Sequence, residues 1–129
     1  MEVRTHRSID PRFSGAVVSL ETGRARVALD TTSDLAADEH ELVHGGFVFS
    51  LADHAAMLAI NEPTVVLGSA DVRFLRPVRV GETVVADAEL APDSGKKKIV
   101  AVTVRRGDDP VLTGTFTCFV PPQHVLAAT

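Results

Sequence analysis

The chain has 129 residues, a net charge of −4 and a single cysteine. This length suits one domain whose core needs no disulfide, and the lone Cys118, within an apolar run, is expected to be a buried structural thiol. The acidic balance argues against nucleic-acid binding. No stretch reaches the roughly 18 apolar residues of a membrane span, and the first residues lack the apolar run of a signal peptide. We therefore expect a soluble, cytoplasmic protein that binds neither nucleic acid nor membranes.

The first part of the chain predicts a β-hairpin. Residues 14–21 form an apolar run typical of a strand, and residues 24–30 alternate polar and apolar side chains as a half-buried strand does. Thr22 and Gly23 supply the turn between them. A polar, acidic loop over residues 31–41 then leads into the next element.

The most informative segment predicts one helix over about residues 45–61. It begins on two glycines, Gly45 and Gly46, and Glu62-Pro63 ends it. Its side chains are apolar on nearly every face, which indicates a buried helix. A single carboxylate, Asp53, lies two turns from the start. Because a charged side chain is rarely buried without a partner or a task, Asp53 is the first candidate for chemistry.

The rest of the chain is typical of strands separated by turns. The expected strands are residues 64–75, 83–90, 97–106 and 111–120, with turns at residues 92–95 and 107–110. The order is β-β-α-β-β-β-β, one α+β domain over residues 1–129. An antiparallel sheet must hide one face, and only one helix is available to cover it. A curved sheet wrapped around a central helix satisfies both conditions.

Gly45 and Asp53 together offer what acyl transfer needs. Bare N–H groups at a helix start, at the positive end of the helix dipole, can hold an oxyanion, and a carboxylate can act as a base or a nucleophile. Eight residues correspond to about 12 Å along a helix, too far for one thioester carbonyl to contact both groups. Joint action therefore requires an antiparallel second helix, in a two-fold dimer that places Gly45 of one chain against Asp53 of the other.

Simpler roles for these residues stay open. Asp53 can be a structural carboxylate that bonds to Ser50 one turn earlier or to a partner at an interface. Gly45 and Gly46 can serve close packing between helices, a role compatible with catalysis. His44, which precedes them, can orient the loop rather than transfer protons.

Two other constellations are disfavoured. His40 and His44 have a spacing found in metal sites, but both lie in an expected loop and no cysteine supports zinc, so no metal is expected. Ser50, Asp53 and His54 have the composition of a hydrolase triad. Positions i, i+3 and i+4 of one helix do not easily give the relay geometry that a triad requires.

The helix carries the motifs His44-Gly45-Gly46 and Leu51-Ala52-Asp53, and Asn61 closes it. Asp71–Pro77 and the turn Gly81-Glu82-Thr83 follow. These motifs resemble the hotdog fold and, within it, the PaaI-like (phenylacetate-type) acyl-CoA thioesterases, over roughly residues 14–120. The chain is also similar to the acyl-CoA-sensing hotdog domain of a bacterial lipid-synthesis repressor, which lacks the helix carboxylate and is joined to a DNA-binding helix-turn-helix.

The resemblance implies a thioesterase for a small or medium acyl-CoA or aroyl-CoA. It implies a homodimer that pairs into a homotetramer, and no cofactor apart from the coenzyme A of the substrate. The implied catalytic residues are Asp53, Gly45 and His44, with Asp53 acting either as general base or as nucleophile. Asp38 stands where relatives often have an asparagine that positions water or substrate.

The expected substrate-binding residues are Asp38, Gly46, Ser69, Arg73 and Arg76. Ser69 and Arg73, with Asp71 between them, are expected to line the acyl pocket. Because phosphates need basic partners, Arg73, Arg76 and Lys96–Lys98 are candidates for the coenzyme A phosphates. The alternative function is a non-catalytic acyl-CoA-binding module, a sensor or carrier. A hotdog dehydratase is a weaker third option.

Overall fold

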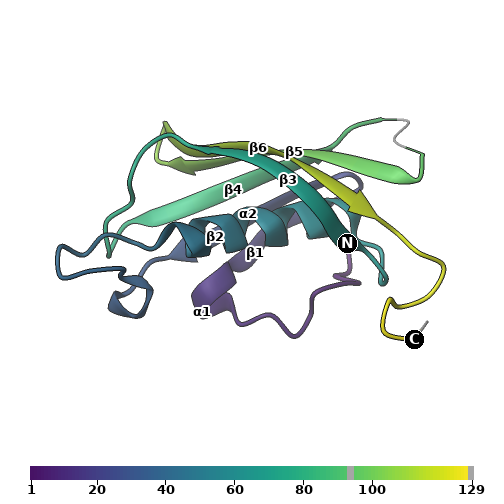
Figure 1. Cartoon of the computed structure of the whole chain (residues 1–129), viewed down its shortest axis with the longest axis horizontal. Helices are drawn as coiled ribbons and strands as arrows, with labels where there is room; N and C mark the ends of the chain where they lie inside the picture. The colour runs from purple at the N-terminus through teal and green to yellow at the C-terminus, as the bar shows by residue number, and fades with distance from the viewer. Residues whose placement is uncertain (93–94, 128–129) are drawn as a thin grey trace.

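The computed structural model describes residues 1–92 and 95–127, and it shows a curved antiparallel sheet wrapped around one long helix (Figure 1). Within these residues the sheet has six strands in the order β1-β2-β4-β5-β6-β3. This is the hotdog fold that the sequence predicts. The strands are β1 (Ala16–Glu21), β2 (Arg24–Asp30), β3 (Val66–Phe74), β4 (Thr83–Leu90), β5 (Lys97–Arg106) and β6 (Asp109–Phe119), and the helices are α1 (Pro11–Ser14), the 3₁₀ turn η1 (Ser33–Leu35) and α2 (Gly45–Ile60).

The first predicted strand is correct except at its start. The prediction began it at residue 14, whereas the short helix α1 occupies Pro11–Ser14. Asp10 caps α1 by accepting the Arg12 N–H at 2.9 Å, and Pro11 stands at the first helical position, where its missing N–H does no harm. Gly15 then has a φ of 86°, which turns the chain into β1.

The last strand begins two residues earlier than predicted. β6 starts at Asp109, so the final turn is confined to Gly107 and Asp108. Pro110 enters the strand opposite Arg105 at an irregularity in the register, where a proline's missing N–H is tolerated. The predicted turn at residues 92–95 includes Asp93 and Ser94, which lie outside the described residues.

Helix α2 forms the centre of the core. Side chains of β2, β4, β5 and β6 alternate, and their inward set packs on the helix. The buried members of this set include Val27, Val84, Val102, Leu112 and Phe116. The helix ends at Asn61, which adopts the left-handed conformation (φ 54°) and donates its N–H to the Met57 carbonyl at 2.8 Å. The predictions of a buried helix and of its end at Asn61 are confirmed.

The N-terminal segment is tied to α2 at both ends, which the sequence did not reveal. The Asn61 amide accepts the Arg4 N–H and donates to the Glu2 carbonyl, both at 2.8 Å. Ser14 accepts a hydrogen bond from His54 Nδ1 at its carbonyl, 2.9 Å away, and its hydroxyl lies 2.6 Å from that of Ser50. The N-terminal segment therefore covers one side of α2, and the sheet covers another.

Strand β3 forms an edge of the sheet that α2 barely covers. Its residues Gly68, Ser69, Ala70 and Asp71 are all exposed, on both faces of the strand. An edge strand presents unpaired backbone N–H and C=O groups to any approaching chain. The inward side of β3 is therefore the open flank of the core.

Candidate functional site

One face of α2 stays partly open over the first half of the helix. Gly45, Phe49 and Asp53 follow one another at intervals of four residues, which places them on the same side of the helix. Each of the three is half-buried, whereas Leu51, Ala52 and their neighbours further along are fully buried. The Phe49 ring packs on Phe116 with the ring centroids 5.5 Å apart. This open stripe, Gly45–Phe49–Asp53, joins the two candidate catalytic groups.

The stripe begins at an uncapped helix N-terminus. His44 occupies the N-cap position, and its side chain makes no capping hydrogen bond. The first N–H groups of a helix have no partner within it, so those at Gly45 and Gly46 are available to a ligand. A Cβ on Gly45 would lie 3.4 Å from the Phe74 ring, and Phe74 is 54% exposed. Phe74 thus lies beside the Cα of Gly45.

His44 folds back over the second glycine. A Cβ on Gly46 would lie 2.9 Å from His44 Nε2, and the imidazole meets the Phe47 ring edge-on at 5.9 Å between centroids. Gly46 therefore leaves room for the His44 ring. The structure gives His44 a place beside the helix start, consistent with an orienting role.

The Asp53 carboxyl is largely buried and lacks a partner. Its Oδ1 is fully enclosed and makes no hydrogen bond with any described residue. Burial raises the pKa of Asp53 to about 6. Burial, and then the charge of Asp53, raise the pKa of the Cys118 thiol to about 12, so the two groups are near neighbours and Cys118 stays protonated. The thiol is structural, as predicted.

Ser50 and His54 form their hydrogen bonds with Ser14 and not with Asp53. Both bond to Ser14, and burial lowers the pKa of His54, which keeps its ring neutral. Ser50 therefore does not satisfy Asp53, and the three residues form no triad. Among the described residues, no group of three or more His, Cys, Asp or Glu side chains could hold a metal ion.

The strand residues expected in the acyl pocket lie on the face of the sheet that points away from α2. Ser69, Asp71 and Arg73 pair with Thr117, Thr115 and Thr113 of β6. The residues that alternate with these threonines, Leu112, Phe116 and Cys118, are the buried ones that face α2. Within one protomer, Ser69 and Arg73 therefore face away from Asp53. A register irregularity between Leu67 and Ser69 sets which of these side chains point inward, and the role of Ser69 and Arg73 in an acyl pocket stays a prediction.

Arg76 does lie at the start of α2. A cavity of about 340 Å³, which we call the helix cavity, is lined by Gly45, Phe74, Arg76 and neighbouring apolar residues. The Arg76 Nη1 group donates to the Pro110 carbonyl at 3.1 Å. Of the predicted substrate contacts on and after β3, Arg76 is the one that the structure brings to Gly45.

Asp38 and the lysine run lie elsewhere. The Asp38 carboxylate accepts the backbone N–H groups of His40, at 2.9 Å, and Leu42, at 3.3 Å, so it shapes its own loop. Lys96 and Lys98 line cavities beside Glu62, past the end of α2. A helix of 16 residues is about 24 Å long, so in one protomer these lysines are remote from Gly45.

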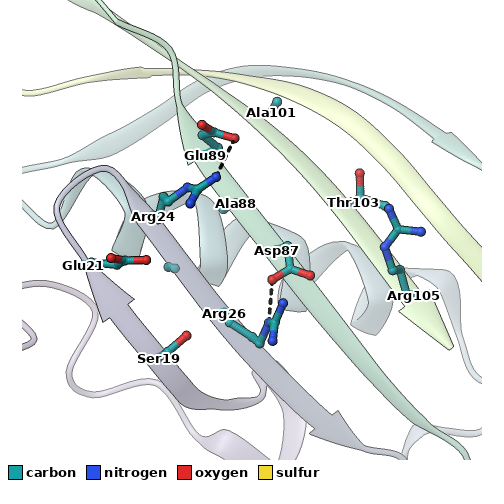
Figure 2. Close-up of a pocket in the computed structure, with 11 residues that line it drawn as sticks. Ser19, Glu21, Arg24, Arg26, Asp87, Ala88, Glu89, Ala101, Thr103 and Arg105 are labelled. Atoms are coloured by element: carbon teal, nitrogen blue, oxygen red, sulfur yellow. Dashed lines mark hydrogen bonds and ion pairs between the residues drawn. The ribbon is translucent and has the colours of Figure 1, made fainter. Parts of the chain in front are cut away.

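A further cavity, of about 490 Å³, is on the outer face of the sheet (Figure 2). It is lined by charged side chains that pair with one another: Arg26 with Asp87 at 2.7 Å, and Arg24 with Glu89 at 3.6 Å. Surface pairs of this kind contribute little to stability. The sheet separates this cavity from Asp53, so it is not the site described above.

Comparison with known proteins agrees with this geometry. Residues 40–113, more than half of the chain, match the thioesterase superfamily. The chain belongs to the thioesterase superfamily. None of the helices in the described part is long and apolar enough to span a membrane.

Two curated relatives are longer proteins. The chain is 47% identical over 116 residues to methylthioribose-1-phosphate isomerase of Aquifex aeolicus, a match that covers 90% of this chain and 25% of that protein. It is 29% identical over 103 residues to the transcription factor FapR of Caldanaerobacter subterraneus, covering 79% of this chain and 52% of FapR. The chain thus spans between a quarter and about half of these relatives.

Solved structures match along nearly the whole chain. The uncharacterized protein PH1136 from Pyrococcus horikoshii is 52% identical with a TM-score of 0.95, covering 98% of this chain and 97% of that one. A mutant of the phenylacetic acid degradation protein PaaI from Thermus thermophilus is 32% identical, with a TM-score of 0.77 and coverage of 84% and 95%. The protein smu.793 from Streptococcus mutans, solved with acetyl-CoA, is 25% identical, with a TM-score of 0.79 and coverage of 92% and 97%.

Proposed function

We propose that this protein is an acyl-CoA thioesterase that hydrolyses a small or medium acyl or aroyl thioester. The observation that carries the proposal is the open stripe of α2: an uncapped helix start at Gly45 and an unpartnered, buried carboxyl at Asp53. An orphaned buried polar atom is unfavourable, so it marks a site completed by a ligand or a partner. Membership of the thioesterase superfamily and the likeness to PaaI support this choice.

The proposed active unit is a homodimer with two shared sites. Gly45 and Asp53 are about 12 Å apart along α2, so one thioester cannot contact both in a single chain. An antiparallel second helix laid along the open stripe would place Gly45 of one subunit against Asp53 of the other. The exposed edge of β3 is suited to the same two-fold axis because it can pair with its copy. Pairing of two dimers into a tetramer is part of the proposal.

The chemistry follows from the two groups. The Gly45 N–H, at the positive end of the helix dipole, polarises the thioester carbonyl. Asp53 of the partner subunit takes a proton from water, whose oxygen adds to the carbonyl carbon, and the oxyanion forms at Gly45. The intermediate then collapses, the C–S bond breaks, and the thiolate of coenzyme A leaves with little help because thiols have a pKa near 8.5. Direct attack by the Asp53 carboxylate, through an anhydride, uses the same placement.

His44 and Asp38 support this site from the loop before α2. The His44 ring rests on Gly46 and fixes the approach to the helix start. Asp38 closes the loop turn through the His40 and Leu42 N–H groups. We assign both a positioning role, with Gly46 providing space for the imidazole.

A non-catalytic acyl-CoA-binding module is the second candidate. The match to FapR, a transcription factor, favours it. The presence of a carboxyl at Asp53 with a pKa of about 6, ionised at neutral pH, favours hydrolysis. Binding alone has no need of an ionised group inside an apolar helix.

The test is thiol release from a panel of acyl-CoA and aroyl-CoA thioesters by the wild type, Asp53→Ala and Asp53→Asn. We expect wild-type turnover on at least one thioester and a loss of a hundredfold or more in both variants, with the oligomeric state unchanged. Absence of turnover on every thioester, with equal binding by wild type and variants, would establish the binding module instead.

A further inference from the structure

A second cavity adjoins the helix cavity. This loop cavity measures about 320 Å³ and lies between the loop before α2, which contributes His40, and the loop between β3 and β4, which contributes Arg79. Both cavities are lined by Leu42, Pro77 and Val78. Because they share this wall, we treat the two cavities as one groove that leads from Gly45 to Arg79.

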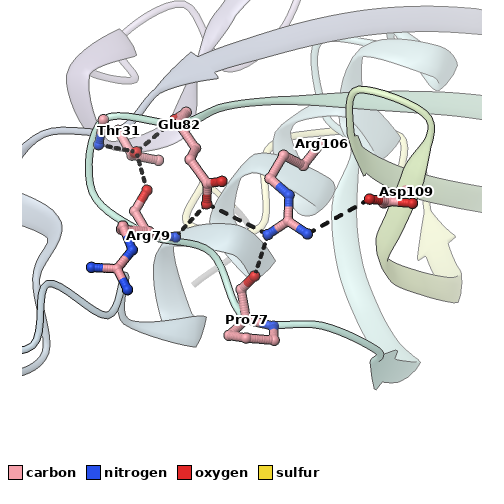
Figure 3. Close-up of polar contacts among 7 residues, drawn as sticks. Thr31, Pro77, Arg79, Glu82, Arg106 and Asp109 are labelled. Atoms are coloured by element: carbon pink, nitrogen blue, oxygen red, sulfur yellow. Dashed lines mark hydrogen bonds and ion pairs between the residues drawn. The ribbon is translucent and has the colours of Figure 1, made fainter.

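Arg106 fixes one wall of this groove. Its Nη1 donates to the Pro77 carbonyl at 2.8 Å, and its guanidinium pairs with Glu82 at 3.5 Å and Asp109 at 3.8 Å (Figure 3). With two carboxylates beside it, the charge of Arg106 is compensated. Arg106 is a positioning residue that holds the loop between β3 and β4 in place.

Arg79 differs from Arg106 because its guanidinium has no carboxylate partner among the described residues. Its backbone, in contrast, is held by hydrogen bonds. Its N–H donates to Glu82 Oε1 at 2.6 Å, and its carbonyl accepts the Glu82 N–H at 3.0 Å. The guanidinium makes no hydrogen bond or ion pair with any described residue, and Figure 3 shows it pointing away from the Glu82–Arg106 pair. A guanidinium held on an ordered loop is well suited to bind phosphate oxygens.

We propose that this groove binds the phosphate-bearing half of coenzyme A, with Arg79 as the principal phosphate-binding residue and Arg76 between it and the thioester. The inference rests on the proposed function, which places the thioester carbonyl at Gly45. From there the pantetheine arm follows the shared apolar wall, and the phosphates reach Arg79. Arg76 and Arg79 line these two cavities, whereas Arg73 lies on the outer face of β3, and Lys96 and Lys98 lie past the far end of α2 in the same protomer.

Glu41 gives the proposal an internal check. Its side chain lines the same cavity, and its carboxylate opposes the attraction of Arg79 for phosphate. Removal of the Arg79 charge and removal of the Glu41 charge are therefore expected to change the affinity for coenzyme A in opposite directions.

The experiment compares an acyl-CoA with the same acyl group carried on pantetheine, which has no phosphate. For Arg79→Gln we expect the KM for acyl-CoA to rise about tenfold, as for a lost charged hydrogen bond, with kcat within twofold. The KM for acyl-pantetheine is expected to stay unchanged. Glu41→Gln is expected to lower the KM for acyl-CoA. Arg105→Gln, which removes an exposed arginine on the outer face of the sheet, serves as the matched control.

The outcomes separate this inference from the proposed function. If the wild type cleaves neither substrate, the proposed function fails. If the wild type cleaves both and Arg79→Gln acts on acyl-CoA like the Arg105→Gln control, the thioesterase proposal stands and the phosphate assignment is overturned. An equal rise in KM for both substrates would also overturn it, because the effect would then not depend on phosphate. Thermal melting of each variant checks that it folds. The KM of Glu41→Gln for acyl-CoA tests the same assignment independently, because it is expected to change in the opposite direction to that of Arg79→Gln.

Discussion

Gly45 and Asp53 lie two turns apart on the same side of α2, and both remain partly open, whereas the residues after Asp53 are buried as far as Ala59. A buried carboxyl without a hydrogen bond is unfavourable in a folded chain, and an exposed edge strand such as β3 leaves backbone N–H and C=O groups unpaired. Both features are found on the flank of the molecule that includes β3. They have a common explanation if a second copy of the chain covers that flank and completes the site.

Replacement of the proposed catalytic carboxyl is expected to stabilise the protein. The pKa of Asp53 is raised from 3.8 to about 6 in the folded state, so ionisation of the buried group opposes folding above pH 6. The stability contributed by the neutral form is lost as the pH rises from about 4 to about 6. Asp53→Asn should therefore raise the free energy of unfolding by about 3 kcal/mol at pH 8, and by much less near pH 4. Urea denaturation at the two pH values measures this difference.

A lower stability of Asp53→Asn at pH 8 would contradict that expectation. It would mean that the ionised carboxylate has a favourable partner in the assembled protein. Ser50→Ala is a useful control because it removes a neighbouring polar group that bonds to Ser14 rather than to Asp53.

The pH dependence of activity should have the same origin. As a base or nucleophile, Asp53 acts in its ionised form, and its pKa of about 6 predicts that kcat/KM rises with pH and levels off above about 7. A pH profile on one acyl-CoA tests this. A rate independent of pH between 5 and 8, with the protein folded throughout, would exclude ionisation of Asp53 as the controlling step.

The oxyanion role of the Gly45 N–H can be tested with a matched pair of variants. Gly45 is the first residue of α2, a position where proline is well tolerated, and Gly45→Pro removes the N–H while keeping the helix. Gly45→Ala adds a Cβ near Phe74 but retains the N–H. We expect kcat to fall about 10²–10³-fold in Gly45→Pro relative to Gly45→Ala. Similar rates for the two, with similar circular dichroism, would place the oxyanion elsewhere.

Asn61 should contribute to stability in two separable ways. Asn61→Ala loses the bonds to Glu2 and Arg4 and also places an ordinary residue at a positive φ. We expect it to lower the free energy of unfolding by about 2–3 kcal/mol. Asn61→Gly loses the same bonds but adopts the left-handed conformation freely, so it should be about 1 kcal/mol less destabilising than Asn61→Ala. Denaturant titrations compare the two, and equal losses would show that the backbone conformation contributes nothing.

The sequence predicted the fold because the fold depends on patterns that are local. Alternation in residues 24–30, the apolar run around Asp53 and the turn glycines specify strands, helix and order without reference to distant residues. The start of β6 was missed because Pro110 was taken as a turn residue, whereas the register irregularity opposite Arg105 admits it into the strand.

The site was only partly predictable, for a physical reason. Gly45 and Asp53 belong to one helix, so their shared face follows from its period. Which face of the sheet Ser69 and Arg73 occupy depends on a shift in strand register that no local pattern reveals. One added residue in a strand moves the following side chains to the other face. The sequence did not single out Arg79, because its role depends on a contact between distant residues. Arg106 pairs with Glu82, and this leaves the Arg79 guanidinium without a counter-charge.

The most direct measurement mixes two inactive variants, Asp53→Asn and Gly45→Pro, under conditions in which subunits exchange. If each site takes Gly45 from one subunit and Asp53 from the other, a mixed dimer has one site with both groups intact and one with neither. Equal mixing should then restore thioesterase activity to about a quarter of the wild-type value, because half of the dimers are mixed and half of their sites are intact. If the mixture stays as inactive as either variant although subunit exchange is shown, for example by mass spectrometry of tagged chains, then Gly45 and Asp53 do not form a site shared between subunits.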